Sequence, residues 1–372
     1  MKKFLSVFLS VIIVFLLFAF SAEGLDCCDL SAECAVVMCV QTGEILFEKN
    51  SHKRHSMAST TKIMTSLIAL EQNTPERVII ADSESINVEG TSMGLQNGDT
   101  VTLKSLVYGM LLLSGNDSAN LTAKAVGGSN EGFAEMMNAR AKEIGMSNTH
   151  FVTPSGLDDE AHYTTAYDMA LLGCEAVKNP EFLKICSSKK AVVSYGNPPY
   201  ERTLYNHNRL LNCYDGALGI KTGFTRKSGR CLVSCAEKDG VQLVAVTLNA
   251  PSDWNDHKLM LDYGFSKILK SEQSEKINVS VTGGNKKSIS ALSKNIVLCA
   301  EKYKKRIFTE KFLYAPVKKG DIVGEVRYFV DDKEIAYSPV IADENVSAIP
   351  VKNEKAEKSE SFQKFKELFR RK

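Results

Sequence analysis

The sequence predicts an α+β fold: an antiparallel sheet flanked by helices with an all-helical subdomain, followed by a small all-β domain. Three observations indicate this fold. Strand patterns stand at both ends of the first 270 residues, helical patterns fill the stretch between them, and short alternating runs with glycine-containing turns follow residue 275. Strands that flank a long helical insert favour a sheet with helices packed on it.

The sheet is predicted from short apolar runs separated by turn residues. Residues 35–40 and 44–48 form the first strand pair, with Gln41-Thr42-Gly43 as the turn between them. Lys238-Asp239-Gly240 is a tight hairpin turn between the last two strands. A helix over residues 254–270 closes this region. The late strands are expected at residues 219–222, 231–237 and 241–249.

Helical periodicity accounts for most of the chain between these strands. Ser59 begins one pattern, and Thr100 and Thr102 are candidate N-caps of the next. Thr165-Ala-Tyr-Asp168 resembles a capping box with Asp in place of Glu. Beyond the helix that starts at Ser59, helices are expected over residues 103–113, 118–126, 130–144 and 165–178.

The first 22 residues are typical of a secretory signal peptide. Met1-Lys2-Lys3 is basic, residues 4–20 are apolar apart from two serines, and Ala19-Phe20-Ser21-Ala22 offers small residues for cleavage. An uncleaved membrane anchor is the alternative, although the apolar core is at the short limit for a spanning helix. Both interpretations predict an exported chain outside the cytoplasm.

Charge and cysteine spacing argue against a nucleic-acid partner and against a metal site. The formal net charge is +2 and the sequence pI is about 7.9, so we expect no nucleic-acid binding, which would need a basic stripe and a higher pI. The ten cysteines show no paired C-x-x-C and no companion histidine run, so we expect no metal site. Mostly free thiols are expected, although an oxidising compartment permits disulfides.

The chain after the predicted signal peptide divides into three parts. Residues 23–270 are expected to form the main domain, residues 276–349 the small β domain, and residues 352–372 a charged tail. The tail carries eight Lys/Arg and four Glu, so its net charge is +4 (8 − 4), and Phe362, Phe365, Leu368 and Phe369 follow helical spacing. This pattern predicts an amphipathic helix on an anionic membrane surface. A solvated tail is the alternative.

Three short motifs carry the candidate chemistry. Ser59-Thr60-Thr61-Lys62 is an S-x-x-K tetrad at a helix start, where residues three apart share a face, so the serine hydroxyl and the lysine amine can meet. Ser114-Gly115-Asn116 lies between two apolar helices, and Lys221-Thr222-Gly223 lies on a late strand. Alone, each motif is weak, because S-x-x-K recurs at Ser187 and at Ser361.

The combination is specific, because the three motifs occur in the order of class A β-lactamases and penicillin-binding proteins. The chain resembles the low-molecular-weight penicillin-binding D-alanyl-D-alanine carboxypeptidases over residues 34–270, with the trailing β domain in its family place. The resemblance extends beyond the motifs to residues 58–65, 113–119, 153–157 and 163–166. It implies a β-lactamase/transpeptidase-like main domain.

The resemblance also implies roles for these residues. Ser59 is expected to be the nucleophile and Lys62 the general base, active only as a neutral amine, with burial beside Lys221 lowering its pKa. Ser114 is expected to relay the proton to the leaving amine, and Asn116 to hold Lys62 and the substrate amide. The remaining residues expected at the substrate are Lys221, Thr222, Gly223 and Phe224.

The implied reaction removes the terminal D-alanine from peptidoglycan pentapeptides through a Ser59 acyl-enzyme, without a cofactor. β-Lactams are expected inhibitors, and the extracytoplasmic membrane face or cell wall is the expected location. Three alternatives remain at this stage. A β-lactamase shares the acyl step, an endopeptidase or transpeptidase shares every catalytic residue, and a non-catalytic envelope binding protein needs none of them.

Overall fold

The computed structural model describes two compact units that divide near residue 270. The predicted signal peptide and the predicted C-terminal tail lie outside the described residues. Among the described residues, no helix is both long and apolar enough to cross a membrane. The described residues are 25–26, 29–72, 74–271, 274–294, 296–298 and 303–350.

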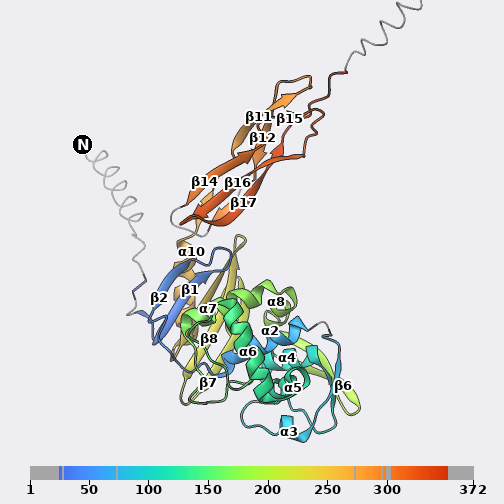
Figure 1. The fold of residues 1–372 in the computed structure, drawn as a ribbon. Helices are drawn as coiled ribbons and strands as arrows, with labels where there is room; N and C mark the ends of the chain where they lie inside the picture. The colour runs from blue at the N-terminus through green and yellow to red at the C-terminus, as the bar shows by residue number, and fades with distance from the viewer. Residues whose placement is uncertain are drawn as a thin grey trace, which may run out of the picture. The chain divides into compact units, whose positions relative to one another are not determined.

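A five-stranded antiparallel sheet in the order β2-β1-β9-β8-β7 is the centre of the first unit (Figure 1). The first strand pairs with β9, so the two ends of the main domain meet inside one sheet. All six residues of β1 are buried, as expected for a strand covered on both faces. The strands are β1 (Cys34–Cys39), β2 (Ile45–Lys49), β7 (Ala217–Thr225), β8 (Gly229–Lys238) and β9 (Val241–Leu248).

Two helices cover opposite faces of this sheet. Gly173 of α7 (Ala166–Lys178) lies against Val244, whereas Gly264 of α10 (Asp253–Ser266) lies against Leu243. Successive strand residues point to opposite faces, so α7 and α10 take different sides. The α+β class is therefore confirmed.

The insert contains the predicted helices close to their predicted bounds. The Thr102 side chain accepts a hydrogen bond from the Ser105 backbone N–H, and Thr165 accepts one from Asp168, so Thr102 and Thr165 act as N-caps. Thr100 instead lies in a strand. The remaining helices are η2 (Ala58–Thr61), α2 (Lys62–Glu71), α3 (Ser83–Ile86), α4 (Leu103–Leu113), α5 (Asn116–Gly127), α6 (Asn130–Ile144), α8 (Pro180–Cys186) and α9 (Leu210–Cys213).

The insert also contains a four-stranded sheet, so it is not all-helical as predicted. Its main hairpin buries Val193, Tyr195 and Leu204 while neighbouring side chains stay exposed. That alternation is typical of a half-buried strand. The hairpin strands β5 and β6 have seven residues each and carry this pattern in the sequence, whereas β3 and β4, with three residues each, are too short to show one. The strands are β3 (Val78–Ile80), β4 (Thr100–Thr102), β5 (Lys190–Gly196) and β6 (Pro199–Tyr205).

The second unit is a β domain with a six-stranded sheet in the order β14-β16-β17-β12-β11-β15. Within that six-stranded sheet β11 and β15 pair in parallel, and the other strand pairs are antiparallel. The predicted helix over 254–270 ends early at Ser266, and strand β10 (Leu269–Ser271) follows it. The other strands are β11 (Lys276–Thr282), β12 (Ser288–Ser293), β13 (Ile296–Leu298), β14 (Lys304–Thr309), β15 (Leu313–Tyr314), β16 (Ile322–Val330) and β17 (Lys333–Ala342).

Buried free thiols among the described residues of the first unit include Cys34, Cys174, Cys186, Cys231 and Cys235. Burial raises the pKa of Cys231 to about 11 and that of Cys174 to about 12. These cysteines therefore act as small apolar core residues and not as reactive thiolates. Cys213 is exposed.

Candidate active site

The S-x-x-K motif places its two functional groups in contact at the junction of η2 and α2. Ser59 lies within the 3₁₀ turn η2, and Lys62 is the first residue of α2. The Lys62 Nζ atom is 2.9 Å from Ser59 Oγ. Lys62 is fully buried, whereas Ser59 is half-buried and lines an open cleft. The Ser59 hydroxyl is thus accessible to a ligand and contacts the buried Lys62 amine.

Two further oxygen atoms hold Lys62 in place. Its Nζ lies 2.7 Å from Asn116 Oδ1 and 2.6 Å from the backbone carbonyl of Ser155. Asn116 is the first residue of α5, and its Nδ2 donates to the Glu89 carbonyl at 2.6 Å, which turns Oδ1 toward the lysine. The S-x-N and S-x-x-K motifs therefore meet at one nitrogen atom.

The protonation state of Lys62 follows from this environment. Burial, reinforced by the charge of Lys221 and opposed by that of Asp117, holds the pKa of Lys62 well below its ordinary value. A neutral amine donates two hydrogen bonds and accepts one. The Asn116 and Ser155 oxygens can only accept, so in a neutral Lys62 the remaining lone pair would be available to accept the Ser59 hydroxyl hydrogen. This is the arrangement that activates a serine.

Ser114 occupies the C-cap of α4 in the left-handed conformation, with φ of 64°. That turn reverses the chain between α4 and α5 and brings Ser114 and Asn116 to the same cleft. The Ser114 carbonyl accepts a hydrogen bond of 2.6 Å from the Thr91 hydroxyl, which anchors the cleft-lining segment at Gly90.

The K-T-G motif lies on β7 with its lysine turned inward. Lys221 is buried, and its Nζ donates to the Thr222 carbonyl at 2.8 Å. Burial lowers the pKa of Lys221 to about 7. Gly223 lies against η2, where an added Cβ would come within 3.1 Å of the Ser59 backbone nitrogen. A side chain here would crowd η2, so the glycine favours the close approach of β7 to the nucleophile, and Phe224 follows on the exposed cleft wall.

These residues surround a cleft of about 610 Å³. Neither Lys62 nor Lys221 lines it, because both lie beneath its surface. Its lining residues are Ser59, Gly90, Thr91, Ser114, Asn116, Ser155, Gly156, Leu157, His207, Arg209, Thr222, Gly223, Phe224, Thr225, Arg230, Pro251, Asp253 and Trp254.

The cleft contains two arginines that the sequence did not single out, Arg209 and Arg230. Arg230 forms a 2.9 Å ion pair with the buried Asp253 and lies over the Trp254 ring at 5.7 Å. Only the β7–β8 register, which pairs Phe224 with Arg230, carries this arginine to the cleft.

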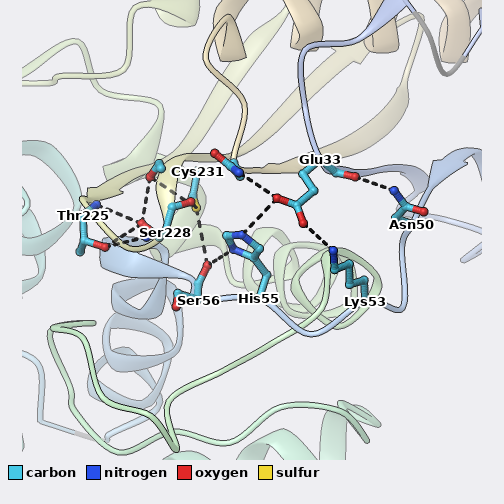
Figure 2. A network of polar contacts seen from close by, with 10 residues as sticks. Glu33, Asn50, Lys53, His55, Ser56, Thr225, Ser228 and Cys231 are labelled. Carbon is cyan, nitrogen blue, oxygen red and sulfur yellow. Dashed lines mark hydrogen bonds and ion pairs between the residues drawn. The ribbon is translucent and has the colours of Figure 1, made fainter.

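A polar network around His55 and Ser56 connects the segment before η2 with Glu33 and Cys231, as Figure 2 shows. The ring Nδ1 of His55 lies 2.8 Å from the Ser56 carbonyl, and that carbonyl also accepts from the Cys231 thiol at 3.8 Å. On its other side His55 faces Glu33 at 3.7 Å. The segment that leads into η2 is thus tied to β8 and to the start of β1.

The described residues contain no group of three or more His, Cys, Asp or Glu that could hold a metal ion. The arrangement at Ser59 instead consists of a hydroxyl, a buried amine, an amide and backbone groups. Such a set suits acyl transfer by a serine nucleophile with a lysine base.

Comparison with known proteins agrees with this geometry. A family model described as D-alanyl-D-alanine carboxypeptidase matches residues 20–252, and one described as the C-terminal domain of penicillin-binding protein 5 matches residues 265–348. The chain is 33% identical to D-alanyl-D-alanine carboxypeptidase DacF of Bacillus subtilis, covering 93% of this chain and 95% of that relative. It is 30% identical to DacC of Escherichia coli, covering 88% of each.

Solved structures give the same result. The carboxypeptidase DacD from Francisella tularensis has a TM-score of 0.63 at 30% identity and covers 88% of this chain and 95% of its own. Penicillin-binding protein 5 from Haemophilus influenzae has a TM-score of 0.62 at 28% identity and covers 87% and 100%. With the family model covering more than half of its length, this chain belongs to the serine-type D-alanyl-D-alanine carboxypeptidase family of hydrolases.

Proposed function

We propose that this protein removes the terminal D-alanine from peptidoglycan stem peptides through an acyl-enzyme on Ser59. The observation that carries the proposal is the contact of a buried Lys62 amine with the Ser59 hydroxyl at 2.9 Å. In the first step Ser59 Oγ attacks the carbonyl carbon of the penultimate D-alanine while its proton passes to Lys62 Nζ. The C–N bond then breaks, and the released D-alanine takes up a proton.

Ser114 is the proposed route for that proton. It lines the cleft together with Asn116, which contacts Lys62, and this placement supports a hydroxyl relay from Lys62 to the leaving amine. Water then attacks the ester, Lys62 takes its proton, and Ser59 Oγ leaves as it takes that proton from Lys62. General acid–base steps of this kind typically contribute about 10²–10⁴-fold to the rate.

Backbone groups are the proposed oxyanion donors. The close approach of Gly223 to η2 supports a pairing of the Ser59 and Phe224 N–H groups around one substrate oxygen. A donor of this kind typically contributes about 2.7–4 kcal/mol. Thr222 and Gly223 would bind the end of the substrate, and Lys221 would supply nearby positive charge.

The same site is proposed to bind β-lactams, whose carbonyl would acylate Ser59 without prompt release. The location we propose is the extracytoplasmic face of the cell membrane or the cell wall, where the peptidoglycan substrate is found. Cleavage of residues 1–22 and membrane attachment through residues 352–372 belong to this proposal. They rest on sequence pattern alone.

The test is the mass of the intact protein after incubation with penicillin, with the modified residue mapped. A single adduct on Ser59, absent from Ser59→Ala, is expected, together with D-alanine release from a muramyl pentapeptide by the wild type only. Release by Ser59→Ala at the wild-type rate would refute the proposal. A rapidly lost adduct would instead indicate a β-lactamase, and cleavage of crosslinked dimers would indicate an endopeptidase.

A further inference from the structure

His162 is a buried histidine that no part of the reaction above uses, yet it lies directly behind the nucleophile. It is 3% exposed. Its Nε2 atom lies 2.8 Å from the hydroxyl of Thr61, the residue before Lys62. Its Nδ1 atom accepts the Val152 backbone N–H at 2.9 Å. One ring therefore joins η2 to the segment that leads to Ser155.

The hydrogen bonds determine the state of this ring. A backbone N–H can only donate, so Nδ1 carries no hydrogen and the neutral ring must carry its hydrogen on Nε2. The Thr61 hydroxyl donates its own hydrogen to the Ala58 carbonyl at 2.8 Å and so accepts from Nε2. Both ring nitrogens are satisfied only when His162 is neutral and in this tautomer.

The segment that His162 holds carries an acceptor for Lys62. Residues 151–159 belong to no helix or strand, so side chains must fix their course. The Thr65 hydroxyl donates to the Pro154 carbonyl at 2.6 Å, and His162 holds Val152 on the other side. One residue beyond Pro154, the Ser155 carbonyl reaches Lys62 Nζ at 2.6 Å.

The surroundings keep this bridge neutral. Burial lowers the pKa of His162 to about 4. The charged and titratable groups that face it are Asp159, which raises the pKa, and His150 and Lys62, which lower it further. The Phe151 ring packs edge-on against the imidazole, with ring centroids 5.9 Å apart. A protonated ring would turn an N–H toward the Val152 N–H and break the bridge.

We propose that His162 is a positioning residue for the general base: it ties the segment carrying the Ser155 carbonyl to η2 and so holds Lys62 buried and aligned on Ser59. This proposal rests on the proposed function, because it assumes that Lys62 is the base. It predicts that loosening the bridge lets water reach Lys62. Since burial is the main cause of the lowered pKa of Lys62, that pKa would rise.

His257 provides a matched control in the same chain. It is also fully buried, its ring nitrogens lie 2.6 Å from Ser234 Oγ and 3.0 Å from Thr247 Oγ1, and burial lowers its pKa to about 3. It lies on α10 against β8 and β9, and neither it nor its two partners line the cleft. Its loss should affect stability without affecting Lys62.

The experiment measures the rate constant for acylation of Ser59 by a fluorescent penicillin as a function of pH, in the full-length protein. In His162→Phe we expect a 10- to 100-fold lower rate, in line with the roughly 10²-fold cost of a 1 Å misplacement. We also expect the acid limb of the pH–rate profile, where the rate falls as Lys62 becomes protonated, to move up by about one pH unit. His162→Asn keeps an acceptor for Val152 and should recover part of the rate and of the shift. In His257→Phe we expect a lower Tm and an unmoved limb.

Contradicting outcomes are distinct. If folded His162→Phe and His162→Asn both keep the wild-type limb and rates within twofold, His162 is merely a core residue. If His257→Phe moves the limb equally, the effect is general loosening and the proposal falls. Should His162→Phe not fold, the acid limb of the His162→Asn profile decides: an upward shift supports the proposal, and a wild-type position refutes it. If the wild type is never labelled on Ser59, the proposed function fails first.

Discussion

At the scale of single residues, burial separates the two lysines of the site into different states. Lys62 has its pKa lowered by burial and by the charge of Lys221, whereas burial alone lowers that of Lys221, to about 7. Each amine is held by oxygen atoms, but only Lys62 touches a hydroxyl. The two lysine side chains therefore differ in their contacts, and only Lys62 is placed to exchange a proton with a hydroxyl.

The buried Lys221 predicts a specific dependence of stability on pH. Its pKa is about 7 in the folded protein against an ordinary 10.5, so the unfolded chain binds more protons between these values. The free energy of unfolding should therefore rise with pH across this window, by at most about 1.4 kcal/mol per pH unit from this group. Below pH 7 its contribution is constant, because the lysine is charged in both states.

Lys221→Met removes this titration. We expect the stability advantage of the variant over the wild type to be largest at pH 7 and below and to shrink toward pH 10.5. Urea unfolding at several pH values measures it, with the exposed Lys227→Met as the control. An advantage that stays constant from pH 7 to 10 would show that Lys221 is not titrating there.

At the scale of elements, the site depends on how closely loops approach η2. Gly156 has φ of 82°, and an added Cβ would lie 1.9 Å from the Ala58 carbonyl oxygen. Gly223 approaches the same turn from β7. Two glycines on different segments thus let backbone close around Ser59, which larger residues would prevent.

Gly156→Ala should therefore damage both stability and catalysis. The added methyl group clashes with η2 and must displace the neighbouring Ser155 carbonyl from Lys62. We expect a loss of at least about 2 kcal/mol, within the range for strained backbone sites, and at least a tenfold slower acylation by penicillin.

Gly145→Ala is the matched control for that substitution. Gly145 also has positive φ, 92°, but nothing lies within 4 Å of its added Cβ. It should lose about 1 kcal/mol from backbone strain and keep its acylation rate. Equal effects of the two substitutions on acylation would refute the argument from close approach.

At the scale of the whole molecule, every residue assigned to the reaction lies in the first unit. A solved Streptomyces DD-transpeptidase aligns with 64% of this chain and 98% of its own, at a TM-score of 0.61 and 28% identity. A fold of this kind is therefore complete without a counterpart of the second unit. The β domain adds its own sheet and core, with Val326 and Val340 fully buried within it.

A chain ending at residue 271 should keep the active site. We expect its acylation rate with fluorescent penicillin to lie within about twofold of the full-length rate, because the chemistry depends only on contacts inside the first unit. Thermal unfolding of the truncated chain provides the control for correct folding. A folded but unlabelled truncated chain would show that the β domain contributes to the site.

Sequence reasoning recovered most elements because their signals are local. The spacing of apolar residues and the caps Thr102 and Thr165 predicted α4, α6 and α7 to within a residue. In the insert sheet, β3 and β4 are three residues long, too short for any periodicity to stand out, whereas the seven-residue strands β5 and β6 carry a local alternation that the prediction missed.

What the sequence by itself determined was the ordered set of motifs, and with it the family and the expected residues. Only Ser59 and Lys62 lie close enough along the chain for geometry alone to predict their contact. The tertiary structure decided the rest. The Ser155 carbonyl, the His162 bridge and the Arg230–Asp253 pair join residues that are 93, 101 and 23 positions apart along the chain. Such contacts, like the pKa of a buried lysine, depend on packing and solvent exclusion, which no local pattern contains.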